Sequence, residues 1–189
     1  MNTPNKLTVL RVLLVPLFLA FLLVGRIPAH YLLALIVFIA ASVTDSLDGY
    51  LARKNSQVTT FGKFLDPLAD KILVLSAMIS FIELGLCGSL VVVIMIAREF
   101  MVTSLRLVAV SGDGTVIAAG MLGKVKTAVQ MVSIVLILIL CMLSEWSLLP
   151  AFVSVPVIAE VLMWVSAVLS VVSGAQYIWK TRTAIGQMK

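Results

Sequence analysis

Long apolar stretches take up most of this 189-residue chain, and they constrain its fold more than any other feature. Charged residues make up only 12% of the chain, against about 25% in ordinary soluble domains. A helix needs about 17–25 apolar residues to cross a bilayer. The hydropathy pattern predicts an all-α integral membrane protein, folded as a single domain over residues 1–189. Its six transmembrane helices are expected at about residues 7–24, 31–52, 61–83, 88–110, 122–144 and 152–179.

Local signals refine this arrangement. Thr3-Pro4 has the composition of a helix start, which predicts a short N-terminal interfacial helix before the first span. Pro156 and Glu160 fall inside the last and longest apolar stretch, so we expect a kink or a tilt there. The Gly-rich segment Ser111–Gly120 is interpreted as a loop. The first apolar run lacks a convincing signal-peptide cleavage site, so it is assigned as a span.

The basic residues orient the helices. All 14 Lys and Arg residues except Arg26 fall on the side that also holds both termini. Because cytoplasmic loops are enriched in Lys and Arg, this side is expected to face the cytoplasm of a multi-pass protein of the cell membrane. The net charge of +5 does not indicate nucleic-acid binding, since no basic run with interleaved aromatic residues is present. Cys87 and Cys141 lack metal-ligand spacing and are interpreted as small apolar fillers, with a disulfide as the alternative.

Four aspartates interrupt this apolar chain at the ends of the second and third expected helices. They are Asp45, Asp48, Asp66 and Asp70. A carboxylate at the centre of a membrane helix costs about 2.5–3.5 kcal/mol by insertion scales, so such a cluster calls for a counter-charge. Hard divalent cations prefer oxygen ligands. Spacings of three and four residues place each pair on one helix face, which suits one metal ion, or two about 4 Å apart.

The residues around the aspartates favour a phosphate ligand. Gly49 and Gly62 allow a ligand or another backbone to approach closely, while Arg53 and Lys63 add positive charge beside the carboxylates. Metal ions together with cationic side chains form a combination that binds phosphates. The alternative is a set of salt-bridged residues at a helix end. Two correctly phased pairs flanked by glycines and cations favour the metal and phosphate site.

The run D45-x2-D48-G49-x2-A52-R53-x8-G62-x3-D66-x3-D70 resembles the signature of the CDP-alcohol phosphotransferase family, at every fixed position. The resemblance implies a six-helix membrane fold and a reaction in which a hydroxyl attacks the β-phosphate of a CDP-linked lipid or alcohol, releasing CMP. It implies that Asp45, Asp48 and Asp66 bind metal ions, that Asp70 is both ligand and base, and that Gly49, Arg53 and Gly62 help to hold the CDP moiety. The expected cofactor is Mg²⁺, or Mn²⁺ in its place, with two ions bound.

Three further segments concern the acceptor. These are N5-K-L-T8-x2-R11, A97-R98-E99-F100 with S104-L-R106, and G123-K124-V-K126-T127-x2-Q130. Together they resemble the phosphatidylglycerophosphate synthase branch of the family, which implies CDP-diacylglycerol as donor and glycerol 3-phosphate as acceptor. Arg98, Arg106, Lys124 and Lys126 would bind the acceptor's phosphate, and Asn5, Thr8 and Lys63 join the CDP-lipid site. For Lys124 and Lys126 the alternative is that they bind no ligand and only set the orientation of the helix in the membrane. For Arg98 the alternative is an ion-pair network with Glu99.

Two rival functions stay open. The first keeps the chemistry and changes the acceptor to inositol phosphate or phosphatidylglycerol. The second is a cation transporter that uses intramembrane carboxylates. Transporters tend to bind ions near the midplane, between interrupted helices and internal repeats, whereas these carboxylates crowd at one expected surface and no repeat is evident. The resemblance also implies a homodimer in the lipid bilayer.

Overall fold

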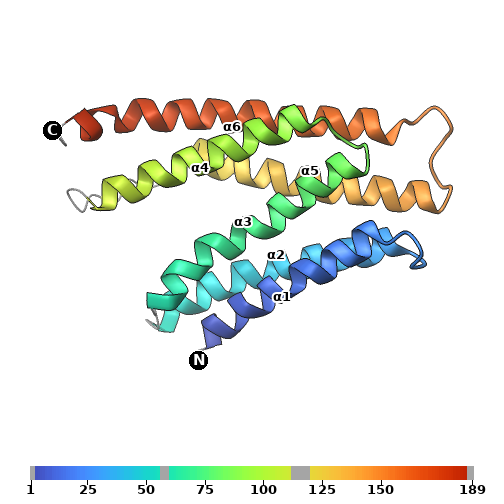
Figure 1. Ribbon diagram of the computed structural model, residues 1–189, viewed down its shortest axis with the longest axis horizontal. Coiled ribbons are helices and arrows are strands. Elements are labelled where there is room, and N and C mark those ends of the chain that lie inside the picture. Colours follow the sequence, from blue (N-terminus) through green and yellow to red (C-terminus); the bar gives the residue numbers. More distant parts are fainter. Residues whose placement is uncertain (1–2, 56–59, 112–119, 187–189) are drawn as a thin grey trace. The chain divides into compact units, whose positions relative to one another are not determined.

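The computed structural model describes residues 3–55, 60–111 and 120–186, with side chains described for residues 10–44, 71–105 and 120–180. All the regular structure in these residues is α-helical, which confirms the predicted all-α class. Figure 1 shows the helices in chain order. They are α1 (Thr3–Leu23), α2 (His30–Asn55), α3 (Thr60–Glu83), α4 (Ser89–Ser111), α5 (Met121–Glu145) and α6 (Val155–Gly186).

The chain divides into two units that share α5. The first comprises residues 1–85 and 134–155, and it therefore holds α1, α2, α3 and the second half of α5. Helix α1 packs against both α2 and α3, and α2 contacts α3 (Figure 1). The rings of Phe18 and Phe38, with centroids 5.6 Å apart, join α1 to α2. Both side chains are fully buried.

The second unit comprises residues 86–133 and 156–189, and it holds α4, the first half of α5 and α6. Its buried apolar residues include Val91 and Met95 of α4 and Met163 of α6. Polar contacts also join its helices. The buried hydroxyls of Ser133 in α5 and Ser166 in α6 lie 3.1 Å apart. Small polar side chains of this kind let helices approach closely in an apolar environment.

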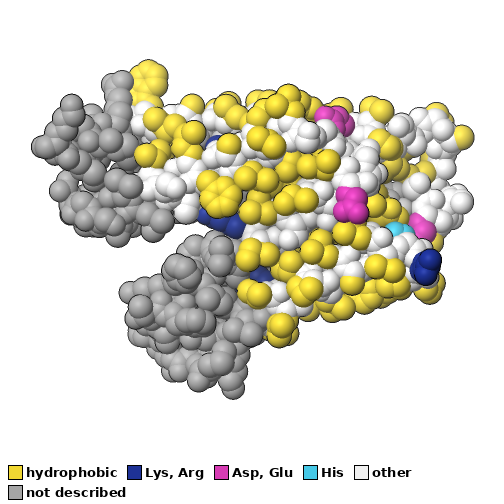
Figure 2. All heavy atoms as spheres, in the orientation of Figure 1, with side chains coloured by type: hydrophobic (Ala, Val, Ile, Leu, Met, Phe, Trp, Pro, Cys, Tyr) yellow, Lys and Arg dark blue, Asp and Glu magenta, His cyan; other side chains and the backbone are white. Residues whose placement is uncertain are grey.

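Apolar side chains remain exposed over much of the surface. Figure 2 shows hydrophobic side chains across large parts of the visible face. Among the described residues, two helices, Met121–Glu145 and Val155–Lys180, are long and apolar enough to cross a membrane. Exposed valines on α6, such as Val161 and Val168, would be costly in water. These features indicate a membrane-associated protein, while the prediction of six spans stays a prediction.

The helix bounds revise two local predictions. The helix start predicted at Thr3-Pro4 is confirmed, but no separate interfacial helix precedes the first span, since α1 runs without a break from Thr3 to Leu23. Pro156 does not mark a kink within the last span, because it is the second residue of α6, while the alternative of a tilt stays a prediction. Proline in the first turn of a helix loses no hydrogen bond, since the N–H groups there have no partner within the helix.

The helix ends follow standard capping rules. Helix α3 ends before Gly85, whose φ of 67° is a left-handed conformation that favours glycine. At the end of α5, Ser147 adopts a similar φ of 55°. There Leu148 donates its N–H to the Leu143 oxygen at 2.9 Å, and Ser147 donates to the Ser144 oxygen at 3.0 Å. This pair of bonds is the Schellman pattern, which satisfies carbonyl groups at a helix end.

Candidate functional site

All four aspartates of the sequence motif lie on helices of the first unit. Asp45 and Asp48 belong to the last third of α2, and Asp66 and Asp70 to the first half of α3. Both pairs thus lie within helices, as their interpretation from spacings of three and four residues requires, and α2 and α3 contact each other and pack on α1. The side chains of these four residues, and those of Asn5, Thr8, Gly49, Arg53, Gly62, Lys63 and Arg106, lie outside the described side chains.

The turn of α2 before the motif is apolar apart from two hydroxyls. Ser42 Oγ donates to the Phe38 oxygen at 2.8 Å, and Thr44 Oγ1 donates to the Ala40 oxygen at 2.7 Å. Such bonds to the preceding turn satisfy a hydroxyl without leaving the helix. They let α2 carry polar residues up to Asp45 while its backbone ladder continues.

His30 lies at the opposite end of α2 from the aspartates. It is the first residue of that helix, and Asp45 follows about four turns later. Its Nδ1 lies 3.2 Å from the Phe21 oxygen, and its Nε2 lies 4.0 Å from Glu145 Oε1. This position is too far along α2 from the aspartates for His30 to act as their base.

Among the described side chains of the first unit, that of Arg11 is the most buried charged one. Its exposed fraction is 1%, and it extends from α1, the helix that packs against both α2 and α3. Charged residues within apolar helices are costly and are usually functional. The sequence placed Arg11 only in a motif at the start of the first helix, and its burial adds a reason to test it.

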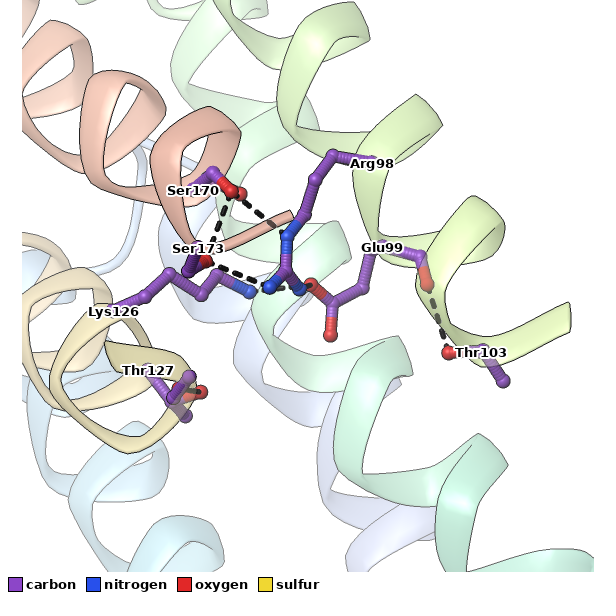
Figure 3. A network of polar contacts seen from close by, with 8 residues as sticks. Arg98, Glu99, Thr103, Lys126, Thr127, Ser170 and Ser173 are labelled. Carbon is purple, nitrogen blue, oxygen red and sulfur yellow. Dashed lines mark hydrogen bonds and ion pairs between the residues drawn. The ribbon is translucent and has the colours of Figure 1, made fainter. Parts of the chain in front are cut away.

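In the second unit, Arg98 of α4 is bound by α6. Its Nε–H donates to the main-chain oxygen of Ser170 at 2.9 Å, and its Nη2 donates to Ser173 Oγ at 2.7 Å. Ser173 Oγ in turn donates to the Ser170 oxygen at 2.9 Å. Figure 3 shows the guanidinium reaching from α4 to this serine pair. Two directed bonds from one planar group fix its position and its orientation.

Glu99 joins Arg98 to Lys126. Arg98 Nη1 donates to Glu99 Oε2 at 3.2 Å, and Lys126 Nζ of α5 donates to the same oxygen (Figure 3). The three side chains are well buried, with exposed fractions of 12% for Arg98, 25% for Glu99 and 4% for Lys126. The ion-pair network that the sequence left open as an alternative is therefore present. Binding of the acceptor's phosphate by these cations stays a prediction.

The two lysines at the start of α5 differ in their surroundings. Lys126 is buried, whereas Lys124 is exposed. The sequence grouped them, because a spacing of two residues in a basic segment does not reveal which side chain faces a neighbouring helix. Of the two, the structure brings only Lys126 into the polar network with Arg98.

The sequence analysis missed the small residues of α6 that contact the side chain of Arg98. Ser170, Ser173 and Gly174 lie three and four residues apart on one face of a helix that is otherwise rich in valine and leucine. A β-carbon at position 174 would lie 3.0 Å from Arg98 Cγ, so glycine leaves room for the arginine. The S170-V-V-S173-G174 cluster was the available signal, since small residues in an apolar helix often mark a close helix contact.

Among the residues whose side chains are described, no three His, Cys, Asp or Glu residues are grouped so that they could hold a metal ion. Both cysteines, Cys87 and Cys141, are buried free thiols, as their interpretation as apolar fillers requires. The residues whose chemistry fits a metal are the four aspartates. Four carboxylates on two contacting helices form the all-oxygen donor set that a hard divalent cation prefers.

Comparison with known proteins decides the family. The model of the CDP-alcohol phosphatidyltransferase family matches residues 1–172. The chain belongs to this family. The resemblance predicted from the aspartate motif is thereby confirmed, and so is the assignment as a transferase. Members of the family are generally dependent on a divalent metal.

Curated relatives match nearly the whole chain. A protein of Bacillus subtilis strain 168 is 43% identical, with 97% of each chain covered. One of Shigella flexneri is 38% identical, covering 96% of this chain and 95% of its own. One of Rickettsia typhi is 34% identical, covering 96% and 98%. All three are named CDP-diacylglycerol–glycerol-3-phosphate 3-phosphatidyltransferase.

Proposed function

We propose that this protein transfers the phosphatidyl group of CDP-diacylglycerol to glycerol 3-phosphate, producing phosphatidylglycerophosphate and CMP. One observation carries the proposal: the chain matches relatives named for this reaction over nearly its whole length. The aspartate motif on α2 and α3 supports it independently, because the motif supplies the residue types that phosphoryl transfer requires.

The four aspartates carry the chemistry in this proposal. Asp45, Asp48 and Asp66 hold the metal, and Asp70 is both a ligand and the general base. When bound, Mg²⁺, or Mn²⁺ in its place, would supply positive charge against the pyrophosphate and polarise the β-phosphorus, with two ions favoured. Support for this donor set comes from its all-oxygen character and from the contact between the helices that carry it.

The proposed reaction is a direct displacement. Asp70 accepts the proton of the acceptor hydroxyl, and the hydroxyl oxygen forms a bond to the β-phosphorus as the bond from that phosphorus to the bridging oxygen breaks. CMP leaves with the bridging oxygen, and the phosphatidyl group stays on the acceptor. No covalent intermediate on the protein is required. The chain's contribution is to orient the two substrates and to position the base.

Two sets of polar residues would hold the substrates. For the CDP head group of the lipid we propose Asn5, Thr8, Asp48, Gly49, Arg53, Gly62 and Lys63. For the phosphate of the acceptor we propose Arg98, Arg106, Lys124 and Lys126. Charge-assisted hydrogen bonds from arginine and lysine to phosphate are about twice as strong as neutral ones. The burial of Arg98 and Lys126 supports them as the stronger pair.

The proposed setting is the cell membrane, with six spans, both termini and the active site on the cytoplasmic side, and a homodimer as the assembled form. The asymmetry of the basic residues supports this orientation. A cytoplasmic site would receive a charged, soluble acceptor from the cytosol and the lipid donor from the bilayer.

The test is release of CMP from CDP-diacylglycerol by the purified protein in detergent with Mg²⁺, across a panel of acceptors. Glycerol 3-phosphate should give the highest rate, with little release without an acceptor. A higher rate with inositol phosphate or phosphatidylglycerol would replace the acceptor but keep the chemistry. Cation flux in vesicles without any release of CMP would favour the transporter.

A further inference from the structure

Glu99 lies where two buried cations meet. Its Oε2 accepts hydrogen bonds from both Arg98 Nη1 and Lys126 Nζ, so two positive charges converge on one oxygen (Figure 3). Both cations are well buried, and arginine and lysine are the side chains that form charge-assisted hydrogen bonds with phosphate.

The two cations differ in how they are held. Arg98 is fixed by Ser170 and Ser173 of α6, whatever the state of Glu99. Lys126 has a flexible four-carbon stem and a point charge without directional preference. Its side chain is 4% exposed, and its ammonium donates to Glu99. Glu99 therefore has its larger effect on Lys126, by holding that ammonium beside the fixed guanidinium.

We propose that Glu99 is a positioning residue for the acceptor site, holding the ammonium of Lys126 next to Arg98 so that both cations bind the same phosphate. The proposal rests on the proposed function, and it adds a residue to which that function assigns no role. Glu99 acts through Lys126 and does not touch the reacting atoms. Its removal should therefore weaken acceptor binding and leave the donor site and the chemical step unchanged.

The first test is Glu99→Gln, which keeps the size of the side chain and removes its charge. The KM for glycerol 3-phosphate should rise about tenfold or more, as expected when a charge-assisted contact to a phosphate is lost. At saturating acceptor, kcat should stay within about threefold of the parent, and the KM for CDP-diacylglycerol within about twofold. A purely structural role for Glu99 would change all three parameters, or the amount of folded protein, without this selectivity.

Glu160→Gln is the matched control, since it removes the same charge from another half-buried carboxylate of the second unit. Glu160 accepts hydrogen bonds from the Gly88 N–H at 2.7 Å and from Trp164 Nε1 at 2.8 Å, and it contacts neither Arg98 nor Lys126 in the described hydrogen bonds. Its KM for glycerol 3-phosphate should stay within about twofold of the parent. An equal rise in both variants would overturn the proposal, because general charge loss would then explain the result.

Two further variants decide whether Glu99 acts through Lys126. Glu99→Asp keeps the charge on a shorter side chain, so its acceptor KM should lie between those of the parent and Glu99→Gln. In a Lys126→Met background, adding Glu99→Gln should raise that KM by no more than about threefold, because two residues in one network are not additive. A further tenfold rise in that background would overturn the proposal. If Glu99→Gln fails to fold, an acceptor KM for Glu99→Asp equal to the parent's would also overturn it.

Failure of this proposal differs from failure of the proposed function. If glycerol 3-phosphate is not the acceptor, the parent itself will release no CMP in response to it. If only the positioning role is wrong, the parent will respond to glycerol 3-phosphate, and Glu99→Gln will show the parental KM or an altered KM for CDP-diacylglycerol.

Discussion

Gly174 of α6 lies against the side chain of Arg98 of α4. A β-carbon at position 174 would meet Arg98 Cγ at 3.0 Å and Nε at 3.3 Å. Arg98 also donates to Ser170 and Ser173 on the same face of α6. The absence of a side chain at position 174 thus allows the arginine to lie close to the helix and reach both serines.

Gly174→Ala should therefore displace Arg98. We expect the KM for glycerol 3-phosphate to rise about threefold to tenfold, because a shift of a few tenths of an ångström weakens but does not abolish a charge-assisted bond. Gly25→Ala is the matched control, since a β-carbon there meets nothing within 4 Å. Steady-state kinetics of both variants measure the difference. Equal acceptor KM values in the two variants would contradict a tight fit at Gly174.

Asp70→Asn removes the proposed base and one metal ligand while keeping the size of the side chain. Loss of a general base costs about 10²–10⁴-fold in rate, so turnover should fall nearly to background. Helix propensity changes little between Asp and Asn, so the amount of protein in the membrane should match the parent. CMP release per milligram of membrane-inserted protein is the measurement. Turnover within about threefold of the parent would rule out Asp70 as base.

The two lysines of α5 should differ in their effect on the acceptor. Lys126 is buried and paired with Glu99, whereas Lys124 is exposed to solvent, where water weakens charge interactions. We expect Lys126→Ala to raise the KM for glycerol 3-phosphate by about tenfold or more and Lys124→Ala by about threefold or less. Arg98→Ala and Arg106→Ala should also raise this KM. A larger change in the KM for CDP-diacylglycerol would move these cations to the donor site.

The proposed topology can be tested with thiol labelling. After Cys87 and Cys141 are replaced, Ser56→Cys should react with an impermeant reagent from the cytoplasmic face only, and Gly25→Cys from the opposite face only. Labelling in the reverse sense would contradict the orientation and the cytosolic source of the acceptor.

In the parent protein, the native Cys87 should itself react only slowly with a thiol reagent near neutral pH. Burial raises the pKa of the Cys87 thiol to about 11, and the nearby Glu160 carboxylate adds to the rise. Only the thiolate is nucleophilic, so its labelling rate should be low near neutral pH and climb as the pH rises toward 11. A rate at pH 7 equal to that of an exposed cysteine would contradict this burial.

Much of the fold follows from the sequence because its signals are local. The apolar stretch expected at 122–144 corresponds to α5, Met121–Glu145, within one residue at each end. The helix start at Thr3-Pro4 was predicted correctly. The effect of Pro156 was misjudged, because it depends on whether a proline stands in the first turn or the interior of a helix. That distinction requires the helix start, which hydropathy alone does not locate.

The candidate site, too, could be predicted only where its signals are local. The aspartate motif could be recognised from the sequence because its spacing is fixed within two helices. The hydrogen bonds of Arg98 to Ser170 and Ser173 could not be predicted, because they depend on which helices become neighbours after more than 70 intervening residues. The different burial of Lys124 and Lys126 has the same origin, since a tertiary contact determines it.

The most direct test of the central claim is transfer of radiolabel from glycerol 3-phosphate into lipid. Purified protein in detergent, with CDP-diacylglycerol, Mg²⁺ and labelled glycerol 3-phosphate, should form an organic-soluble product carrying a phosphate monoester, with one CMP released per label transferred. A metal chelator should stop the transfer, and added Mg²⁺ or Mn²⁺ should restore it. Release of CMP without label in the lipid, or no dependence on CDP-diacylglycerol, would contradict the proposed reaction.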